Sequence, residues 1–277
     1  MLDILRALIL GIVEGITEWL PISSTGHLIL VEQIVGTVIS EDFKEMFDVV
    51  IQLGAIMAVV VIYFHKLNPF SPSKSKQEKQ QTKQLWYKVV VACIPAGVVG
   101  VLLDDWIDEH FFNPVVVALT LIIYGIWFIA IESGKRKKPT AEELEKLTYK
   151  NAFTIGCFQI LALIPGTSRS GSTIIGGMLS GCSRFVATEF TFFLGIPVMF
   201  GASFLKILKY FVKGGTFTGM EISVLAVGMI VSFVVSILAI KFLIGYVKKN
   251  DFKAFGVYRI ILGAIVLVCA ALGFVSI

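Results

Sequence analysis

Long apolar stretches, separated by shorter polar segments, make up most of this chain. A helix needs about 20 mainly apolar residues to cross roughly 30 Å of hydrocarbon. The stretches that approach or exceed this length cover residues 46–64, 87–103, 114–132, 188–211, 222–246 and 254–276. We therefore predict six membrane-spanning helices. Kinks are expected at Pro95 in the second and Pro197 in the fourth, because proline removes a helix hydrogen bond.

Two further apolar segments, residues 2–35 and 151–182, are interrupted in the middle by small, polar and helix-breaking residues. The interruptions read PISSTGH from Pro21 and PGTSRSGST from Pro165. Each apolar arm is roughly 10 to 18 residues long, which suits a helix that enters the membrane, turns at depth and leaves by the same face. We therefore predict two re-entrant helical hairpins.

The two interruptions resemble each other, which indicates an internal repeat. Leu20–Ser24 aligns with Ile164–Ser168 at an offset of 144, and Leu53–Gly54 aligns with Leu194–Gly195 at an offset of 141. A near-constant offset of half the chain indicates duplication.

The expected repeats are residues 1–138 and 139–277, together forming one membrane domain. Each repeat would hold one hairpin and three spans. Because three is odd, the second repeat should be upside down relative to the first, and the two hairpins should enter from opposite faces. The predicted fold class is therefore an all-α integral membrane protein with an inverted-topology repeat.

The composition supports this fold class and excludes an ordinary soluble enzyme or a disordered chain. Of the 277 residues, 56% are hydrophobic and 16% are charged, whereas a soluble domain carries about a quarter charged residues. The four cysteines lie alone, without metal-ligand spacing, and are expected to be small buried apolar side chains.

The charges of the loops predict the orientation of the chain. The loops after the first and third spans are basic, and the loop between them is acidic. These charges are Lys66, Lys74, Lys76, Lys79, Lys83 and Lys88, then Lys135, Arg136, Lys137, Lys138, Lys146 and Lys150, and between them Asp104, Asp105, Asp108 and Glu109. Basic loops stay on the cytoplasmic side, so both termini and the mouth of the first hairpin are expected outside. Lys206, Lys209 and Lys213 are the exception, and no nucleic acid partner is needed to explain the basic loops.

Three charges lie at membrane depth: Glu14, Glu18 and Arg169. A charge at the bilayer centre costs on the order of 2.5 to 3.5 kcal/mol on insertion scales, so these side chains must be paired or line water. This cost argues against a purely structural membrane protein. Glu14 and Glu18 are four residues apart and project from one helix face, so they form a candidate site for a divalent cation, Mg²⁺ or Ca²⁺.

Beyond each interruption a helix is expected to restart, near Ser24 and near Ser172. Helix N-termini present free N–H groups and the positive end of the helix dipole. If the two hairpin tips meet, these ends and Arg169 would form a phosphate site. The predicted phosphate-binding residues are Arg169, Ser23, Thr25, Gly26, Ser168, Ser170, Gly171 and Thr173.

His27 lies three residues after Ser24 and can reach that hydroxyl. We predict catalytic roles for Ser24, His27, Glu18 and Arg169 in phosphoryl transfer. His27 would act as general acid or base, and Ser24 either as nucleophile or as a group that orients water. Asp48 and Gln52 either support this site or line a polar cavity.

The two motifs, G-x-x-E-G-x-T-E-W-L-P-I-S-S-T-G-H from Gly11 and P-G-x-S-R-S-G-x-T from Pro165, resemble the signatures of the undecaprenyl-diphosphate phosphatase family, the bacitracin-resistance type. The resemblance covers essentially the whole chain. In that family the acid pair, the serine and histidine of the first motif and the arginine of the second form the site. The resemblance implies these roles for Glu14, Glu18, Ser24, His27 and Arg169.

The resemblance also implies the substrate and the location. The expected activity removes the terminal phosphate of a polyprenyl diphosphate lipid at the outer face of the bacterial plasma membrane. This would regenerate the lipid monophosphate for peptidoglycan synthesis and protect against bacitracin.

A lipid flippase or ion-coupled transporter is the alternative, because inverted repeats and broken helices are typical of transporters. The cluster of Ser24, His27 and Glu18 favours the enzyme, because transport does not require it. Gly176, Gly177 and Gly181 could pack helices within one chain or between two chains, so a homodimer is possible.

Overall fold

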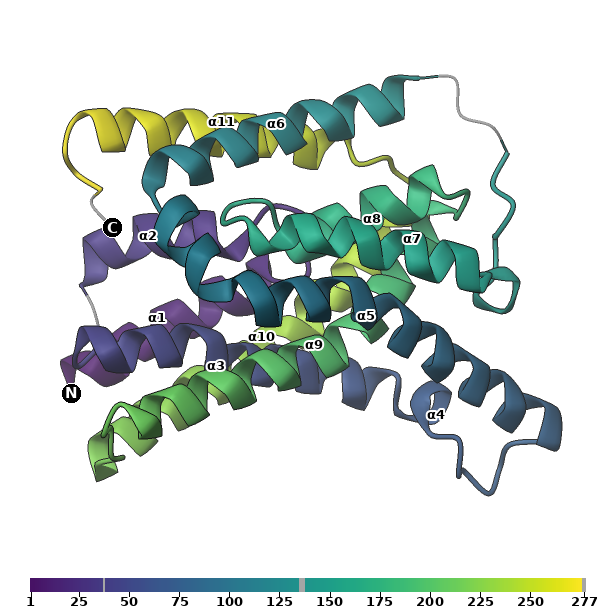
Figure 1. Cartoon of the computed structure of the whole chain (residues 1–277), viewed down its shortest axis with the longest axis horizontal. Helices are drawn as coiled ribbons and strands as arrows, with labels where there is room; N and C mark the ends of the chain where they lie inside the picture. The colour runs from purple at the N-terminus through teal and green to yellow at the C-terminus, as the bar shows by residue number, and fades with distance from the viewer. Residues whose placement is uncertain (37, 135–137, 276–277) are drawn as a thin grey trace.

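The computed structural model describes residues 1–36, 38–134 and 138–275, without the side chains of Glu41, Asp42, Asp104 and Asp108. Lys135, Arg136 and Lys137 of the second basic loop, and the acidic groups of Asp104 and Asp108, therefore lie outside the described residues. The helices (Figure 1) are α1 (Leu2–Thr17), α2 (Ser24–Val35), α3 (Glu41–Ile62), α4 (Phe64–Leu67), α5 (Lys76–Phe111), α6 (Pro114–Ser133), α7 (Tyr149–Ile160), α8 (Arg169–Leu179), α9 (Arg184–Val212), α10 (Gly219–Val247) and α11 (Lys253–Ala271).

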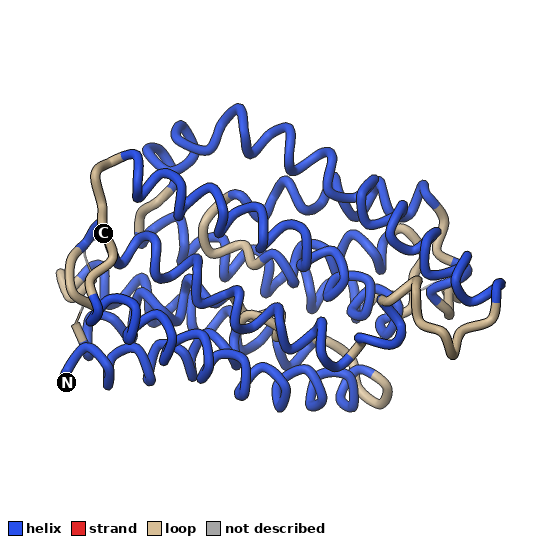
Figure 2. The backbone as a smooth tube through the Cα atoms, turned by 90° about the horizontal axis from the view of Figure 1, so that it is seen from below, coloured by secondary structure: helices blue, strands red, loops and turns tan. Residues whose placement is uncertain are grey.

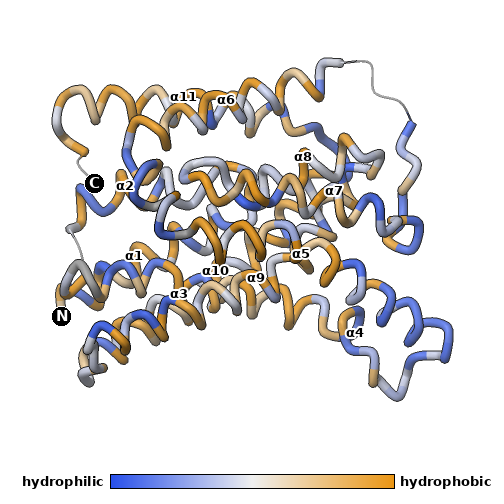
Figure 3. Tube along the Cα trace, in the orientation of Figure 1, coloured by the Kyte–Doolittle hydropathy of each residue, from blue (hydrophilic) through white to orange (hydrophobic). Residues whose placement is uncertain are grey.

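Six helices of the described chain are long and apolar enough to cross a membrane: α3, α5, α6, α9, α10 and α11. The prediction of six helices able to span a membrane is therefore confirmed. The second span is part of a longer helix than expected, because α5 has 36 residues and begins with several polar turns before its apolar part (Figure 3). Pro95 and Pro197 lie inside α5 and α9.

Side-chain caps determine where several helices begin. A side-chain oxygen that accepts the backbone N–H three residues ahead satisfies one of the free donors of a first helical turn. The residues that do so before α3, α6, α7, α9 and α10 are Ser40, Asn113, Thr148, Ser183 and Thr218.

The long helices run roughly along one direction, and most loops gather at the two ends of the bundle (Figures 1 and 2). The start of α1, the end of α11 and the α2–α3, α5–α6 and α9–α10 links lie at one end. The α4–α5 link, the described part of the α6–α7 link and the α10–α11 link lie at the other end, and the first two belong to the predicted basic loops. This grouping agrees with the sidedness that the loop charges predict.

The helix pairs α1–α2 and α7–α8 each turn back in the middle of the bundle (Figure 1). The two turns use the same backbone device. Ser23 and Ser168 both have φ of 72°, a left-handed conformation that is uncommon for residues other than glycine. The Ser23 hydroxyl accepts from Gly26 N, and the Ser168 hydroxyl accepts from Gly171 N, so each serine caps the helix that follows it.

These caps correct the alignment of the two turns. Ser23 and Ser168 are 145 positions apart, whereas aligning Pro21 with Pro165 gives 144. The capping hydroxyl, and not the proline, fixes where the helix begins. As a result α8 begins at Arg169 instead of near Ser172, and Ser24 and Arg169 are both first residues of their helices.

Close backbone approaches connect the two halves of the chain. A Cβ on Gly11 or Gly15 of α1 would lie 2.8 Å from a carbonyl oxygen of α10, and a Cβ on Gly156 of α7 would collide with the carbonyl oxygen of Ala92 in α5. Gly11 and Gly156 are again 145 positions apart. Thus the first helix of each pair packs directly on a long helix of the other half, as small residues permit.

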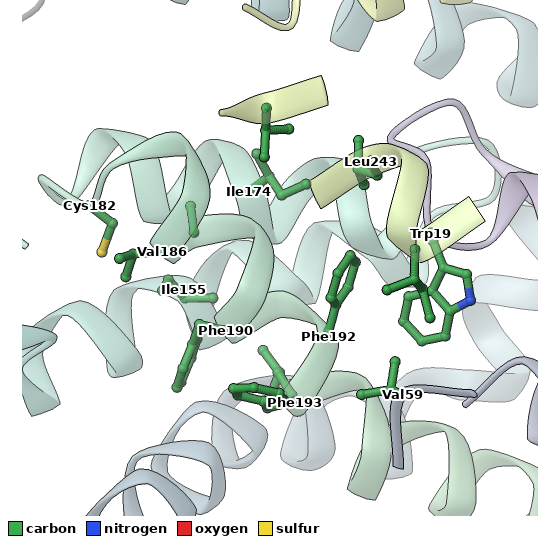
Figure 4. Packing of buried hydrophobic residues seen from close by; sticks show 14 of the residues in the cluster. Trp19, Val59, Ile155, Ile174, Cys182, Val186, Phe190, Phe192, Phe193 and Leu243 are labelled. Carbon is green, nitrogen blue, oxygen red and sulfur yellow. The ribbon is translucent and has the colours of Figure 1, made fainter. Parts of the chain in front are cut away.

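The largest buried cluster also draws on both halves (Figure 4). Trp19, from the first turn, contacts Phe192 of α9 edge to face, with ring centroids 5.1 Å apart. The predicted packing residues Gly176 and Gly177 contact Phe158 and Ala187, and Gly181 faces Thr140. These small residues therefore pack helices and loops within the chain.

Candidate active site

Glu18 connects the two turns through its carboxylate. The residue follows directly on α1, keeps helical geometry and is 8% exposed. Its Oε1 atom accepts a hydrogen bond of 2.7 Å from Arg169 Nη2, and its Oε2 atom accepts one of 3.2 Å from Ser24 Oγ. The structure thus brings together three predicted catalytic residues that are up to 151 positions apart.

Helix α9 holds the guanidinium of Arg169 in place. Arg169 Nη1 donates to the Thr191 carbonyl at 3.0 Å, and the guanidinium carbon lies 5.6 Å from the centre of the Trp19 ring. A Cβ on Gly195 would lie only 2.8 Å from Arg169 Nη1. A glycine at this position therefore leaves the space that the arginine occupies.

Glu14 lies one helical turn before Glu18 and is fully buried. Neither of its carboxylate oxygens has a hydrogen-bond partner within residues 1–36, 38–134 and 138–275. The charges of Glu18, Asp48 and Arg169 all act on it. A buried carboxylate without hydrogen bonds is costly, so its environment calls for a cation or water.

The acid pair was predicted to hold a divalent cation, and its chemistry fits one. Glu18 N donates to Glu14 O at 3.0 Å, so the helical spacing that places both carboxylates on one face persists to the end of α1. Hard oxygen ligands suit Mg²⁺ and Ca²⁺. The described residues contain no group of three or more His, Cys, Asp or Glu side chains placed to hold a metal ion. Water and the oxygens of a phosphate are candidates for further ligands.

His27 makes two side-chain hydrogen bonds, and neither involves Ser24. Nδ1 lies 2.7 Å from the Ser23 carbonyl, and Nε2 lies 2.7 Å from the Tyr258 hydroxyl. Because a carbonyl oxygen only accepts, Nδ1 carries the proton, and the Tyr258 hydroxyl donates to Nε2 when the ring is neutral. The two rings are nearly parallel, at 9°. The predicted reach from His27 to Ser24 is thus not a hydrogen bond here, since Ser24 donates to Glu18.

The predicted phosphate-binding residues divide into two groups. Some hydroxyls stabilise the turns themselves. Ser170 Oγ donates to the carbonyls of Glu18 and Leu20 at 3.1 and 3.2 Å, and Thr173 Oγ1 donates to the Arg169 carbonyl at 2.8 Å. The serine caps Ser23 and Ser168 belong to this group as well.

The other group lies at the helix starts. Thr25 is half-buried and makes no side-chain hydrogen bond within the described parts of the chain. Gly26 and Gly171, in the first turns of α2 and α8, lie close to their neighbours, since a Cβ would be 2.9 Å from a methyl group of Leu121 and 3.3 Å from Ser168 Cβ, respectively. Together with Arg169, these two N-termini are the part of the site suited to an anion.

Two neighbouring residues of α11 belong to the surroundings of the site but were not predicted from the sequence. Tyr258 holds His27, and Arg259 is fully buried beside both turns. A signal for Arg259 was available, because it is a charge within the apolar stretch 254–276. The insertion cost that singled out Glu14, Glu18 and Arg169 applies equally to it. Tyr258 gave no such signal, because tyrosines are common at membrane interfaces.

Fold and site together define a helical membrane protein with a charged, anion-suited centre enclosed between two helix turns. The comparisons with known proteins agree. A model of the family described as bacitracin resistance protein BacA matches residues 7–265. The chain is 64% identical to the undecaprenyl-diphosphatase of Enterococcus faecalis over 95% of each chain. It is 62% identical to the enzyme of the same name from Lactiplantibacillus plantarum, over 96% of this chain and 98% of that one.

A third relative, the undecaprenyl-diphosphatase of Streptococcus thermophilus, is 57% identical over 96% of this chain and 93% of its own length. The chain therefore belongs to the bacitracin resistance protein BacA family. This confirms the family resemblance that the two motifs predict.

Proposed function

We propose that the protein hydrolyses undecaprenyl diphosphate to undecaprenyl phosphate and inorganic phosphate. Its family and the names of its relatives support this activity over the alternative, a flippase or transporter. One observation carries the proposal at the level of chemistry. The carboxylate of Glu18 accepts hydrogen bonds from the hydroxyl of Ser24 and from the guanidinium of Arg169. A guanidinium is a group that commonly binds phosphate in proteins.

In the proposed reaction the bond between the bridging oxygen and the terminal phosphorus breaks. The bridging oxygen keeps the bonding electrons and leaves as part of undecaprenyl phosphate, while a new bond forms from the phosphorus to a water that Ser24 orients or to Ser24 Oγ. In the second case a water then attacks the phosphoserine, which releases inorganic phosphate and returns the hydroxyl of Ser24. Glu18 takes the proton that the nucleophile loses, because it already accepts the hydrogen bond of Ser24. Arg169 and the N-termini of α2 and α8 stabilise the negative charge on the transferred phosphate.

His27 shuttles a proton between the site and its surroundings, held by the Ser23 carbonyl and the Tyr258 hydroxyl. Glu14 and Glu18 would hold a divalent cation, which would supply positive charge beside the diphosphate. The orphaned carboxylate of Glu14 supports this assignment.

The proposed membrane placement follows the predicted topology. α1–α2 and α7–α8 are re-entrant hairpins from opposite faces, and the site opens to the outer face of the bacterial plasma membrane with both termini outside. The common cap at Ser23 and Ser168 supports a repeat of residues 1–138 and 139–277, and three spans in each copy would make that repeat inverted. Hydrolysis there recycles the lipid carrier for cell wall synthesis and removes the target of bacitracin. A homodimer remains a prediction.

Phosphate release from undecaprenyl diphosphate by the purified protein in detergent tests the activity, because detergent micelles have no compartments between which transport can occur. We expect Mg²⁺- or Ca²⁺-dependent release that is lost in Ser24→Ala, His27→Ala and Arg169→Ala. Ser223→Ala is the matched control, since this exposed hydroxyl only donates to the carbonyl of Gly219 in α10. A wild-type protein that releases no phosphate with either cation would refute the proposal.

A further inference from the structure

Arg259 of α11 joins the two turns to the rest of the bundle. Its side chain is fully buried, and its guanidinium donates to four carbonyl oxygens. Nη1 donates to Pro21 O in the first turn at 3.2 Å. Nη2 donates to Gly166 O and Thr167 O in the second turn, both at 3.0 Å. Nε donates to Leu121 O of α6 at 3.4 Å.

These bonds use four of the five N–H donors that an arginine has. Arg259 forms no ion pair with a carboxylate of the described chain, so carbonyl oxygens and the ring of Tyr124, 5.6 Å from the guanidinium carbon, offset the cost of burying its charge. A planar fork of donors can reach several segments at once, whereas a lysine ammonium is a single point with three donors. The geometry is therefore specific for arginine.

The contacts of Arg259 lie next to the proposed catalytic groups along the chain. Pro21 is three residues before Ser24, and Thr167 is two residues before Arg169. A shift of either carbonyl would move the first residue of α2 or α8, and with it a partner of Glu18. The preceding residue, Tyr258, forms a hydrogen bond with His27.

We propose that Arg259 is a positioning residue of the phosphatase site: it fixes the two turns relative to each other so that Ser24 and Arg169 meet at Glu18. The inference rests on the proposed function. Helix α11 contributes neither the acid pair nor the serine. Its proposed role is to set the distance between the two halves of the site. Within the described chain, the Arg259 side chain donates its hydrogen bonds to backbone carbonyls and to none of the side chains proposed to react.

A merely structural arginine would behave differently. Its loss would lower the fraction of folded protein and leave the turnover of each folded molecule unchanged. A positioning residue lowers kcat of the folded protein while KM changes little, because a misplacement of about 1 Å can cost roughly 100-fold in rate.

The experiment compares Arg259→Lys and Arg259→Met with Arg184→Lys. Arg184 pairs with Glu132 at the end of the bundle that carries the basic loops, so it controls for the loss of a partly buried arginine elsewhere. We expect kcat for undecaprenyl diphosphate, per folded protein, to fall about 10-fold in Arg259→Lys and about 100-fold in Arg259→Met, with KM within about 2-fold. Arg184→Lys should keep the wild-type kcat.

A second readout does not depend on turnover. With 5-fluorotryptophan incorporated, the ¹⁹F resonance of Trp19, assigned by Trp19→Phe, reports the guanidinium of Arg169 beside its ring. We expect this resonance to shift in Arg259→Lys, with those of Trp86 and Trp106 unchanged, and to stay in place in Arg184→Lys. If Arg259→Met does not fold, Arg259→Lys decides the question alone.

An unchanged Trp19 resonance in folded Arg259→Lys, or a kcat within about 2-fold of wild type, overturns the positioning role. This failure is distinct from failure of the proposed function, in which the wild-type protein itself releases no phosphate while the ¹⁹F comparison can still be made.

Discussion

Glu14 of α1 and Gln159 of α7 lie at equivalent positions of the two hairpin-like pairs, 145 residues apart, the same offset that separates the capping serines Ser23 and Ser168. Both side chains are buried, and the polar atoms of both lack hydrogen-bond partners within the described chain. Yet only one of them is an acid. The second half thus has a buried polar side chain of similar shape at this position but lacks the charge, so the proposed cation would be bound by the first half alone.

Glu14→Gln should therefore fold normally and lose activity. The second half shows that this fold accommodates a buried glutamine at the equivalent position, and the substitution removes a buried carboxylate without hydrogen bonds. We expect an unchanged or higher thermal unfolding midpoint in detergent. Phosphate release should fall roughly 100-fold, because a bound cation supplies several kcal/mol of charge stabilisation.

Gln159→Ala is the matched control for this variant, because it alters the equivalent buried position of α7. It should keep the metal dependence of the wild-type protein. A Glu14→Gln protein that responds to Mg²⁺ and Ca²⁺ as the wild type does would contradict the role of Glu14.

The sequence was sufficient for those parts of the fold that depend on hydrophobicity. Six spans, two interrupted segments and the grouping of basic loops at one end all follow from where apolar and charged residues lie. The hydrophobic pattern did not predict how the residues of the first turn align with those of the second. Proline spacing suggested one alignment, and only the hydrogen bonds of Ser23 and Ser168 show that the caps determine it.

The sequence predicted those site residues whose charge is costly to place in the membrane. Charges at membrane depth must have partners, which singled out Glu18 and Arg169, and the structure pairs them. Which hydroxyl partners which acid was not predictable, because it depends on how the two turns meet. Ser24 donates to Glu18 and His27 contacts Tyr258, a residue 231 positions away that no local pattern connects with the motifs.

Gly195 should be essential for the position of Arg169. In Gly195→Ala the new Cβ would lie 2.8 to 3.0 Å from the guanidinium atoms, so the arginine must shift from its position beside Glu18. We expect kcat to fall about 10- to 100-fold. Gly201→Ala, on the same helix α9, is the matched control because its Cβ would have no neighbour within 4 Å. Equal activities of the two variants, measured as phosphate release, would argue against this packing role.

Removal of divalent cations should abolish turnover reversibly. The fully buried Glu14 and the adjacent Glu18 are the proposed ligands, so a chelator should stop phosphate release, and added Mg²⁺ or Ca²⁺ should restore it. In Glu14→Gln, the cation concentration needed for half-maximal rate should rise at least about 10-fold. Full activity of the wild-type protein after exhaustive chelation would exclude a cation-dependent mechanism.

Gly166 in the second turn offers a test of the turn geometry itself. Its φ is 83°, and a Cβ there would collide with the Thr120 hydroxyl, which donates to the Pro165 carbonyl at 2.8 Å. Gly166 O is also an acceptor of Arg259. Gly166→Ala should therefore displace the turn, lower the thermal unfolding midpoint and reduce kcat of the folded protein.

Gly214→Ala separates backbone strain from displacement of the turn. Gly214 has a similar φ of 88°, but a Cβ there would meet nothing within 4 Å. Strain from the left-handed conformation, about 1 to 2 kcal/mol, should be the whole effect, so this variant should be slightly less stable and fully active. Comparison of kcat per folded protein for the two variants decides the point. If Gly166→Ala loses stability to the same small degree and keeps its rate, the second turn tolerates displacement. The hypothesis that activity depends on the position of this turn would then be wrong.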